Sequence, residues 1–196
     1  MSDTQTDVTS LTKRPKRADA RRNYDALLAA ARDAFTEDGS DASLEDVARR
    51  AGVGIGTLYR HFPNRHALIE AVYVEEVERM ARTADDLADL EPWDALSTWL
   101  RHFVGYAATK RALAEELMNS AGADSEVLLS CRRAISAAGE PLLRRAQDAG
   151  VVRRDLSFMD VGRMVGGIAV IRAADAGQIE RILEVALDGL RYRPAE

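Results

Sequence analysis

Residues 43–64 read SLEDVARRAGVGIGTLYRHFPN, and this stretch decides the fold. Ser43 and Asp46 have the spacing of a capping box, with Asp in place of the preferred Glu or Gln, so a helix is expected to begin here. The glycines of Gly52-Val53-Gly54 interrupt that helix. Its apolar face comprises Leu44, Val47, Ala48 and Ala51.

A second short helix is predicted over about residues 55–62, because Pro63 pushes the residue before it out of helical geometry. Two short helices joined by a glycine-containing turn are the sequence form of a helix-turn-helix. Leu58 and Phe62 are four residues apart and should pack inward. The outward positions are Ile55, Gly56, Thr57, Tyr59, Arg60 and His61. Small groups followed by aromatic and cationic ones suit a helix that enters a DNA major groove.

A longer helix is predicted to precede this pair. It begins at residue 19 or 20 and ends near Gly39, with apolar side chains at helical spacing: Leu27, Leu28, Ala31, Ala34 and Phe35. Residues 1–18 are polar and are expected to form a flexible basic tail. The helix-turn-helix domain is therefore predicted over residues 19–66.

Charge is segregated along the chain. The formal net charge is −5, and residues 71–196 carry all of it. Between residues 47 and 69 there are arginines and histidines but no acid, and basic residues also crowd residues 13–22. This pattern gives a local footprint for phosphate, although a solvated tail and helix face would look the same.

The remainder of the chain, residues 67–193, is predicted to form a helical domain for effector binding and dimerisation, which makes the protein all-α. Helices are expected over about residues 64–89, 92–110 and 111–120, and then over 125–149 and in two final segments. Gly139 and Pro141 should kink or split the helix over 125–149.

Two apolar stripes run along residues 92–110, so this helix is expected to be buried in the middle of its domain. Its polar aromatic positions are either satisfied core groups or the orienting groups of a ligand pocket. The candidate pocket residues are Trp99, His102, Phe103 and Tyr106.

The last two helices also allow two interpretations: they complete the domain core, or they pair with the same helices of a second copy. The candidate dimer-interface residues are Val161, Met164, Val165, Ile168, Ile179, Leu183, Leu187 and Leu190.

Several other classes of function are disfavoured. No apolar run is long enough to span a membrane, and the start of the chain lacks the apolar region of a secretory signal. The single cysteine suits a reducing cytoplasm. Arg132 and Arg133 beside Cys131 would lower the pKa of its thiol and make it redox-sensitive, but the favoured interpretation is a small helix residue with no such role. His61 and His66 are spaced wrongly for a metal site, and no nucleotide cradle is present, so no metal or cofactor is expected.

Residues 20–70 resemble the DNA-binding domain of the TetR family. The resemblance rests on the core Gly56-Thr57-Leu58-Tyr59-Arg60-His61-Phe62 and on the flanking Ala51-Gly52-Val53, Arg65 and Leu68. Residues 110–116 and 141–155 weakly resemble the SbtR-like branch of that family. The resemblance implies a cytoplasmic homodimer with a four-helix interface, a ligand pocket in each larger domain, and repression that a small molecule relieves.

The resemblance also implies roles for individual residues. Positions that face phosphates in the family are matched by Ser43 beside Leu44 and by Tyr59, His61 and Arg65. The surface that faces the bases is matched by Ile55, Gly56, Thr57 and Arg60. Arg17 and Arg21 match basic residues that reach the minor groove. Gly54 departs from the family's frequent serine, so one hydroxyl contact is missing. Arg65 replaces the usual lysine, and its fork can hold a phosphate with two bonds.

The sequence thus predicts a DNA-binding regulator with partners of three kinds: a pseudo-palindromic double-stranded operator, a second copy of the chain, and an unidentified small-molecule effector. Two alternatives stay open. A protein of this architecture could bind DNA broadly or partner other proteins. An α-helical enzyme is the third possibility, but no catalytic constellation stands out.

Overall fold

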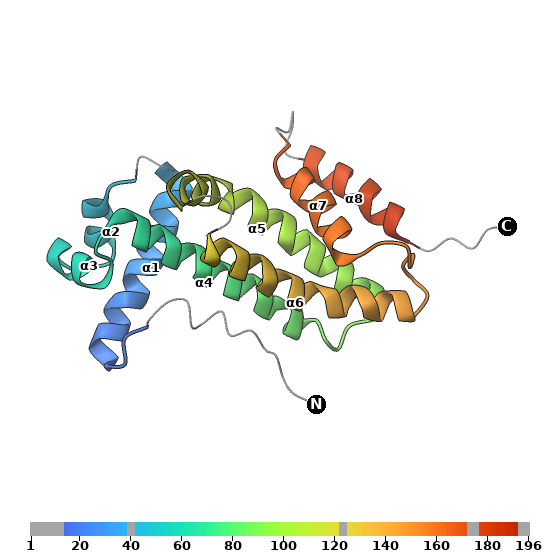
Figure 1. The fold of residues 1–196 in the computed structure, drawn as a ribbon, viewed down its shortest axis with the longest axis horizontal. Coiled ribbons are helices and arrows are strands. Elements are labelled where there is room, and N and C mark those ends of the chain that lie inside the picture. Colours follow the sequence, from blue (N-terminus) through green and yellow to red (C-terminus); the bar gives the residue numbers. More distant parts are fainter. Residues whose placement is uncertain (1–13, 39–41, 122–124, 172–176, 192–196) are drawn as a thin grey trace. The chain divides into compact units, whose positions relative to one another are not determined.

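The protein is all-α in a computed structural model that describes residues 14–38, 42–121, 125–171 and 177–191. Within these residues the helices are α1 (Ala18–Asp38), α2 (Leu44–Arg50), α3 (Ile55–His61), α4 (Arg65–Asp86), α5 (Pro92–Ala121), α6 (Glu126–Asp148), α7 (Phe158–Ala169) and α8 (Gln178–Leu190) (Figure 1). No helix in the described ranges is long and apolar enough to cross a membrane.

The chain divides into two compact units, and α4, α5 and α6 each contribute a part to both. The first unit contains residues 1–78 and 110–131, and the second contains residues 79–109 and 132–196. The predicted helix-turn-helix segment therefore lies in the first unit together with the first turns of α4, the last turns of α5 and the start of α6.

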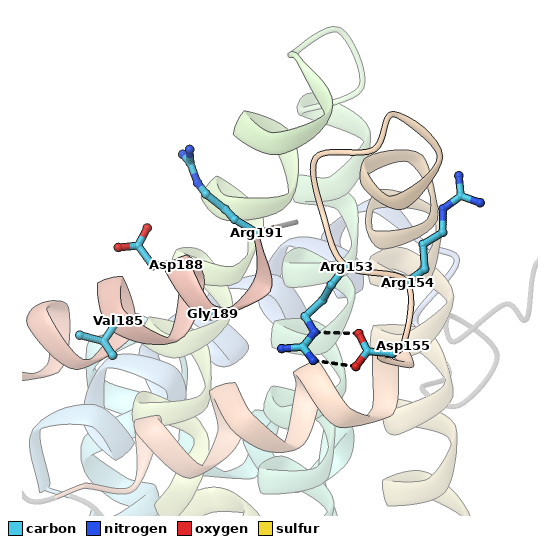
Figure 2. A pocket seen from close by; sticks show the side chains of 7 residues that line it. All are labelled: Arg153, Arg154, Asp155, Val185, Asp188, Gly189 and Arg191. Carbon is cyan, nitrogen blue, oxygen red and sulfur yellow. Dashed lines mark hydrogen bonds and ion pairs between the residues drawn. The ribbon is translucent and has the colours of Figure 1, made fainter. Parts of the chain in front are cut away.

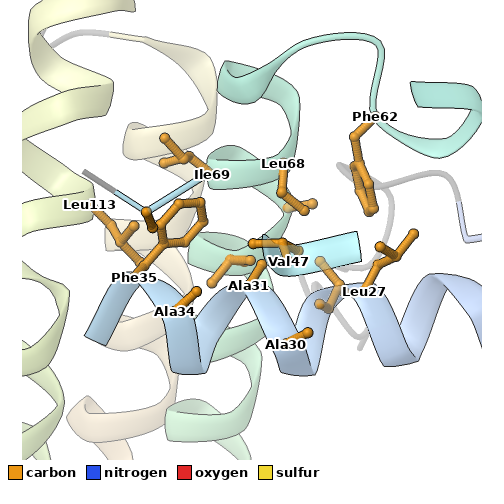
Figure 3. Close-up of a cluster of buried hydrophobic side chains, with 14 of the residues drawn as sticks. Leu27, Ala30, Ala31, Ala34, Phe35, Val47, Phe62, Leu68, Ile69 and Leu113 are labelled. Atoms are coloured by element: carbon orange, nitrogen blue, oxygen red, sulfur yellow. The ribbon is translucent and has the colours of Figure 1, made fainter. Parts of the chain in front are cut away.

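The core of the first unit is built on one face of α1. Leu27, Ala31 and Phe35 recur at helical spacing and are buried against apolar residues of α2, α3 and α4 (Figure 3). From α5 and α6, Leu113 and Leu128 complete the same cluster. Because each of these large side chains contributes about 1.5–3 kcal/mol when fully buried, this cluster is the main stabilising element of the unit.

A buried ion-pair network lies beside this core. The carboxylate of Glu76 on α4 is 4% exposed and lies 3.3 Å from the Lys110 ammonium of α5, which is also 4% exposed. Arg32 of α1 lies 3.6 Å from the other carboxylate oxygen. Removing charges from water costs several kcal/mol per ion, so such a network is tolerated only with all members present. It therefore ties α1, α4 and α5 together.

The second unit packs an aromatic cluster against a glycine. A Cβ at Gly139 of α6 would collide with the Phe158 ring and would lie 2.8 Å from Trp99 Cη2, so only glycine fits there. Phe158 begins α7, whose start is fixed by a full capping box between Ser157 and Asp160.

Two predictions about helix boundaries are wrong. Residues 111–120 are not a separate helix, because α5 continues without a break to Ala121; the stretch after Gly105 contains no Gly or Pro and is rich in strong helix formers. Nor do Gly139 and Pro141 split α6, which is helical on both sides of them. Pro141 is exposed, so water can solvate the carbonyl that loses its partner, and the Trp99–Phe158 contact explains Gly139.

Cys131 is a buried residue of α6 and not a reactive thiol. Burial, followed by the charges of Glu70 and Glu78, raises the pKa of the Cys131 thiol to about 12. Arg132 and Arg133 are exposed and do not lower it. The idea that these arginines make Cys131 redox-sensitive is therefore wrong for this fold.

The buried network predicts a large stability loss for Lys110→Met. The substitution leaves the Glu76 carboxylate buried without the Lys110 ammonium, which should lower the free energy of unfolding by about 3 kcal/mol. Urea denaturation followed by circular dichroism measures the change. Arg144→Ala, which breaks the exposed pair with Glu140, is the control and should cost under about 0.5 kcal/mol. Equal losses for the two variants would contradict the role given to the network.

Candidate nucleic-acid interface

The turn between α2 and α3 sets the angle between the two helices. Ser43 caps α2, its Oγ accepting the Asp46 backbone N–H at 3.0 Å, as predicted. After α2, Gly52 adopts φ +69°, a conformation that side chains disfavour. The Val53 N–H donates to the Ala48 carbonyl at 3.0 Å and closes the turn. Gly54 is the N-cap of α3 and supplies no side-chain hydrogen bond.

α3 buries one side and exposes the other. Leu58 is 0% exposed and Phe62 is 3% exposed, and the Phe62 ring lies 5.0 Å from Tyr24 of α1. These contacts fix the rotation of α3 about its axis. Val53 from the preceding turn packs against the same cluster.

The opposite side of α3 presents the predicted outward residues to solvent. Ile55 is 36% exposed and Tyr59 is 46% exposed, and Gly56 and Arg60 are also exposed. No atom lies within 4 Å of a Cβ built at Gly56, so this surface is open to close approach. The surface offers a phenol, a guanidinium and an apolar contact on one short helix.

Two of the predicted outward residues are less exposed to solvent than the others. Thr57 is half-buried, and so is His61, whose ring lies edge-on to Tyr24 at a centroid distance of 5.9 Å. The contact with Tyr24 orients the imidazole. The sequence pattern of α3 gave no sign of this neighbour, because Tyr24 lies on α1.

The arginines of α2 are compensated by acids. Arg50 lies 2.7 Å from Glu37 and 2.5 Å from Asp46, and Arg49 also pairs with Asp46. Hydrogen bonds from Arg50 and then Arg49 lower the pKa of Asp46, and Glu37 and then Asp46 raise the pKa of Arg50. Residues 47–69 contain no acid, but their surface is not free of acids, because Glu37 and Asp46 from outside this stretch pair with its arginines.

Arg65 has a structural contact that sequence reasoning missed. Its guanidinium donates a hydrogen bond to the Ala42 carbonyl and lies over the Phe35 ring, 5.1 Å from its centroid. Ala42 directly precedes the capping residue Ser43. Arg65 at the start of α4 thus holds the entry to α2, where Ser43 is exposed and Leu44 is half-buried against the core.

The basic arm, residues 13–22, is only partly described. Residues 1–13 lie outside the described residues; Arg17 and Arg21 are exposed, and the Arg21 N–H donates to the Arg17 carbonyl at 2.9 Å at the start of α1. Arg14 lies 3.1 Å from Glu75 of α4. The two arm residues named from the sequence are thus accessible on the surface of the first unit.

The candidate pocket residues lie on the part of α5 in the second unit. Trp99 is 0% exposed, and Phe103 and Tyr106 are half-buried. His102 is exposed, so the expectation that it lies in the interior of the domain is wrong: α5 is buried on one side only.

The candidate dimer residues lie mainly inside one chain. Of the predicted set, Val161, Val165, Ile168, Leu183, Leu187 and Leu190 are buried within the single chain, and Met164 and Ile179 are half-buried. The buried members complete the core, which is the first of the two interpretations, and have little surface left for a partner.

The exposed side of α8 carries a different set of residues. Val185 is 74% exposed and lines a shallow surface hollow of about 330 Å³ with Gln178, Arg181 and Ile182. A second hollow of about 770 Å³ lies between the end of α8 and residues 153–155, where Arg153 Nε and Nη2 each donate to the Asp155 carboxylate at 2.7 Å (Figure 2).

Comparisons with known proteins agree with this geometry. A family described as bacterial regulatory proteins of the tetR family matches residues 27–72, and the SbtR-like transcriptional regulator C-terminal domain matches residues 91–192. The TetR transcriptional regulator SCO0520 from Streptomyces coelicolor is 42% identical, with a TM-score of 0.73 over 85% of this chain and 97% of its own.

Two further relatives extend the comparison. A TetR regulatory protein from Mycobacterium vanbaalenii is 34% identical, with a TM-score of 0.71 over 91% of this chain and 100% of its own. The HTH-type transcriptional regulator SAR0097 from Staphylococcus aureus is 38% identical over 85 residues, which is 41% of this chain and 44% of that protein.

Gly54→Ser should stabilise the protein. The N-cap has φ −74° and ψ 150°, a conformation that serine adopts readily, and a Cβ there meets nothing within 4 Å. A hydroxyl would accept one free N–H of α3, which adds a few tenths of a kcal/mol to the free energy of unfolding. Gly54→Ala is the matched control and should be about 1 kcal/mol less stable than Gly54→Ser in urea denaturation. Equal stability of the two variants would contradict the capping geometry.

Proposed function

The chain belongs to the TetR family of bacterial regulatory proteins, and we propose that it represses transcription by binding a pseudo-palindromic operator from which a small-molecule effector releases it. Members of this family are DNA-binding transcriptional regulators and not enzymes. The observation that carries the proposal is the exposed surface of α3, held outward by the burial of Leu58 and Phe62.

In the proposed complex, α3 enters the major groove with its N-terminal end foremost. Gly56 and Thr57 allow close approach, and Ile55 offers an apolar contact to a thymine methyl group. Arg60 is the residue that hydrogen-bonds a base edge. Tyr59 and His61 contact phosphates and fix the register of the helix.

Phosphate contacts outside α3 complete the proposed complex. The N-terminal end of α2, at Ser43 and Leu44, approaches the backbone, and Arg17 and Arg21 follow the minor groove. Arg65 keeps its bond to the Ala42 carbonyl and adds charge near the same phosphates. This combination positions the protein, while the bases select the sequence.

The proposed homodimer uses the exposed sides of α7 and α8. Val185 on α8, Met159 on α7 and Val170, the C-cap of α7, are each at least half exposed, so they offer apolar surface to a partner. Gly162 and Gly166 have open space around them, so a second helix could approach α7 closely. Two protomers would then present two copies of α3 to half-sites about one helical turn apart.

The proposed effector acts by shifting a population between two states. A ligand that binds the second unit more tightly in one state moves the protein toward it, and the two copies of α3 then no longer match the half-site spacing. Equal affinity for both states would shift nothing, so the effector must distinguish them.

Selection of bound fragments from sheared genomic DNA tests the proposal. The selection runs at about 150 mM salt with excess competitor DNA, because backbone affinity varies steeply with salt. An inverted repeat near a few promoters supports a site-specific dimeric regulator. Scattered fragments with no shared motif would favour broad DNA binding or a protein partner instead.

Substitutions on α3 should separate affinity from specificity. Arg60→Ala should weaken operator binding by about 1–3 kcal/mol and relax the preference at one operator position. Tyr59→Phe removes only the hydroxyl and should weaken operator and competitor DNA alike, by about 1 kcal/mol. Fluorescence anisotropy with single-base operator variants measures both. If Arg60→Ala keeps its base preference at every position, the base-reading role is wrong.

Val185→Glu should disrupt the dimer. A carboxylate placed in an apolar interface loses its hydration without a partner, so the variant should sediment as a monomer and bind the operator more than tenfold more weakly. Leu90→Glu is the matched control, because Leu90 is a 44% exposed apolar residue of the same unit outside the proposed interface. A dimeric Val185→Glu protein would show that α8 pairs differently or not at all.

A further inference from the structure

Three aromatic rings form a ladder along one side of α5 in the second unit. The Trp99 and Phe103 rings lie 5.6 Å apart between centroids at an interplanar angle of 12°, and Phe103 and Tyr106 lie 5.9 Å apart at 18°. The ladder runs from a fully buried end at Trp99 to half-buried rings at Phe103 and Tyr106. It therefore offers flat surfaces that lead inward from solvent.

The buried end of the ladder carries a hydrogen-bond donor without an acceptor. Trp99 is 0% exposed, and its buried indole Nε1 has no hydrogen-bond partner among the described residues. A buried donor left unsatisfied is unfavourable, and tryptophan N–H groups in protein interiors usually find a partner. A bound molecule with a hydrogen-bond acceptor would satisfy this donor.

The surroundings of the ladder are apolar and closely packed. Phe158 at the start of α7 lies 5.8 Å from the Trp99 ring, and Gly139 leaves room for both rings where any other residue would collide with Phe158. Among the described residues of this unit no charged side chain is buried, and Ser97 is the buried polar one. A charged ligand would therefore be buried here without a side chain of opposite charge.

We propose that this ladder binds a neutral, planar aromatic molecule that carries a nitrogen or oxygen acceptor. The acceptor takes the hydrogen bond from Trp99 Nε1, and the ring of the molecule takes the place of the half-buried Phe103 and Tyr106 side chains, which turn aside. The inference rests on the proposed function, since this molecule would be the effector, and it narrows the effector to one chemical class.

Quinoline and naphthalene provide a matched pair of probes. The two have the same shape, but only quinoline has a ring nitrogen that accepts a hydrogen bond. In a Trp93→Phe protein with ¹⁵N-labelled tryptophan, the single indole N–H signal comes from Trp99. Quinoline should move the indole proton downfield and should bind about tenfold more tightly than naphthalene, the ratio expected for one satisfied hydrogen bond.

A second variant identifies the donor. In Trp99→Phe, the preference for quinoline over naphthalene should be lost or reversed, because the N–H is gone and the quinoline nitrogen would be buried without a hydrogen bond. If that variant does not fold, the indole proton shift in the Trp93→Phe protein still decides the matter. No quinoline binding at millimolar concentration, or equal binding of both probes without a downfield shift, overturns the proposal.

Operator DNA separates this inference from the proposed function. Anisotropy of labelled operator is measured with the Trp93→Phe protein, with and without saturating quinoline. Specific operator binding by a protein whose indole proton signal does not move with quinoline would support the proposed function and overturn only the ligand class. A quinoline shift in a protein that binds no specific DNA would support the aromatic site and contradict the proposed function.

Discussion

The burial of Leu58 and Phe62 is the constraint on which the account of this protein depends. The two residues are one turn apart on α3, and both are buried in the cluster built on α1, where Phe62 contacts the Tyr24 ring. Together they stabilise the unit by about 3–6 kcal/mol, so α3 has one rotational setting. That setting turns Tyr59 and Arg60 to solvent, and the positive φ of Gly52 lets α3 leave α2 at the required angle.

The features that the sequence predicted well are those with local causes. The cap at Ser43, the turn at Gly52 and the inward position of Leu58 follow from residues within a few positions of each other. The errors involve tertiary context. Nothing local shows that Pro141 lies on the exposed side of an unbroken helix, or that His102 faces water. Likewise, an apolar stripe such as that of Leu183 and Leu187 looks the same whether it packs within a chain or between chains.

The charged residues show the same difference between local and tertiary causes. The run of basic residues after Val47 reads as one positive surface in the sequence, yet Arg50 is compensated by Glu37 from α1 as well as by Asp46. The free positive charge of the candidate interface therefore lies on α3 and the arm more than on α2. The buried Glu76–Lys110 pair joins residues that are far apart in sequence, and only their burial distinguishes them from ordinary surface charges. A short stretch of sequence cannot predict such a pair, because it does not contain both partners.

Site-directed DNA cleavage tests the central claim, that the exposed side of α3 lies in the major groove. Gly54→Cys places a thiol at the exposed start of α3, where an iron chelate can be attached, while the buried Cys131, with its raised pKa, stays unlabelled. Cleavage is expected to flank the major groove at the centre of each operator half-site, and none is expected from a chelate attached through Leu90→Cys, at an exposed position of the second unit outside the proposed dimer interface. Diffuse cleavage, or equal cleavage from both positions, would contradict the central claim.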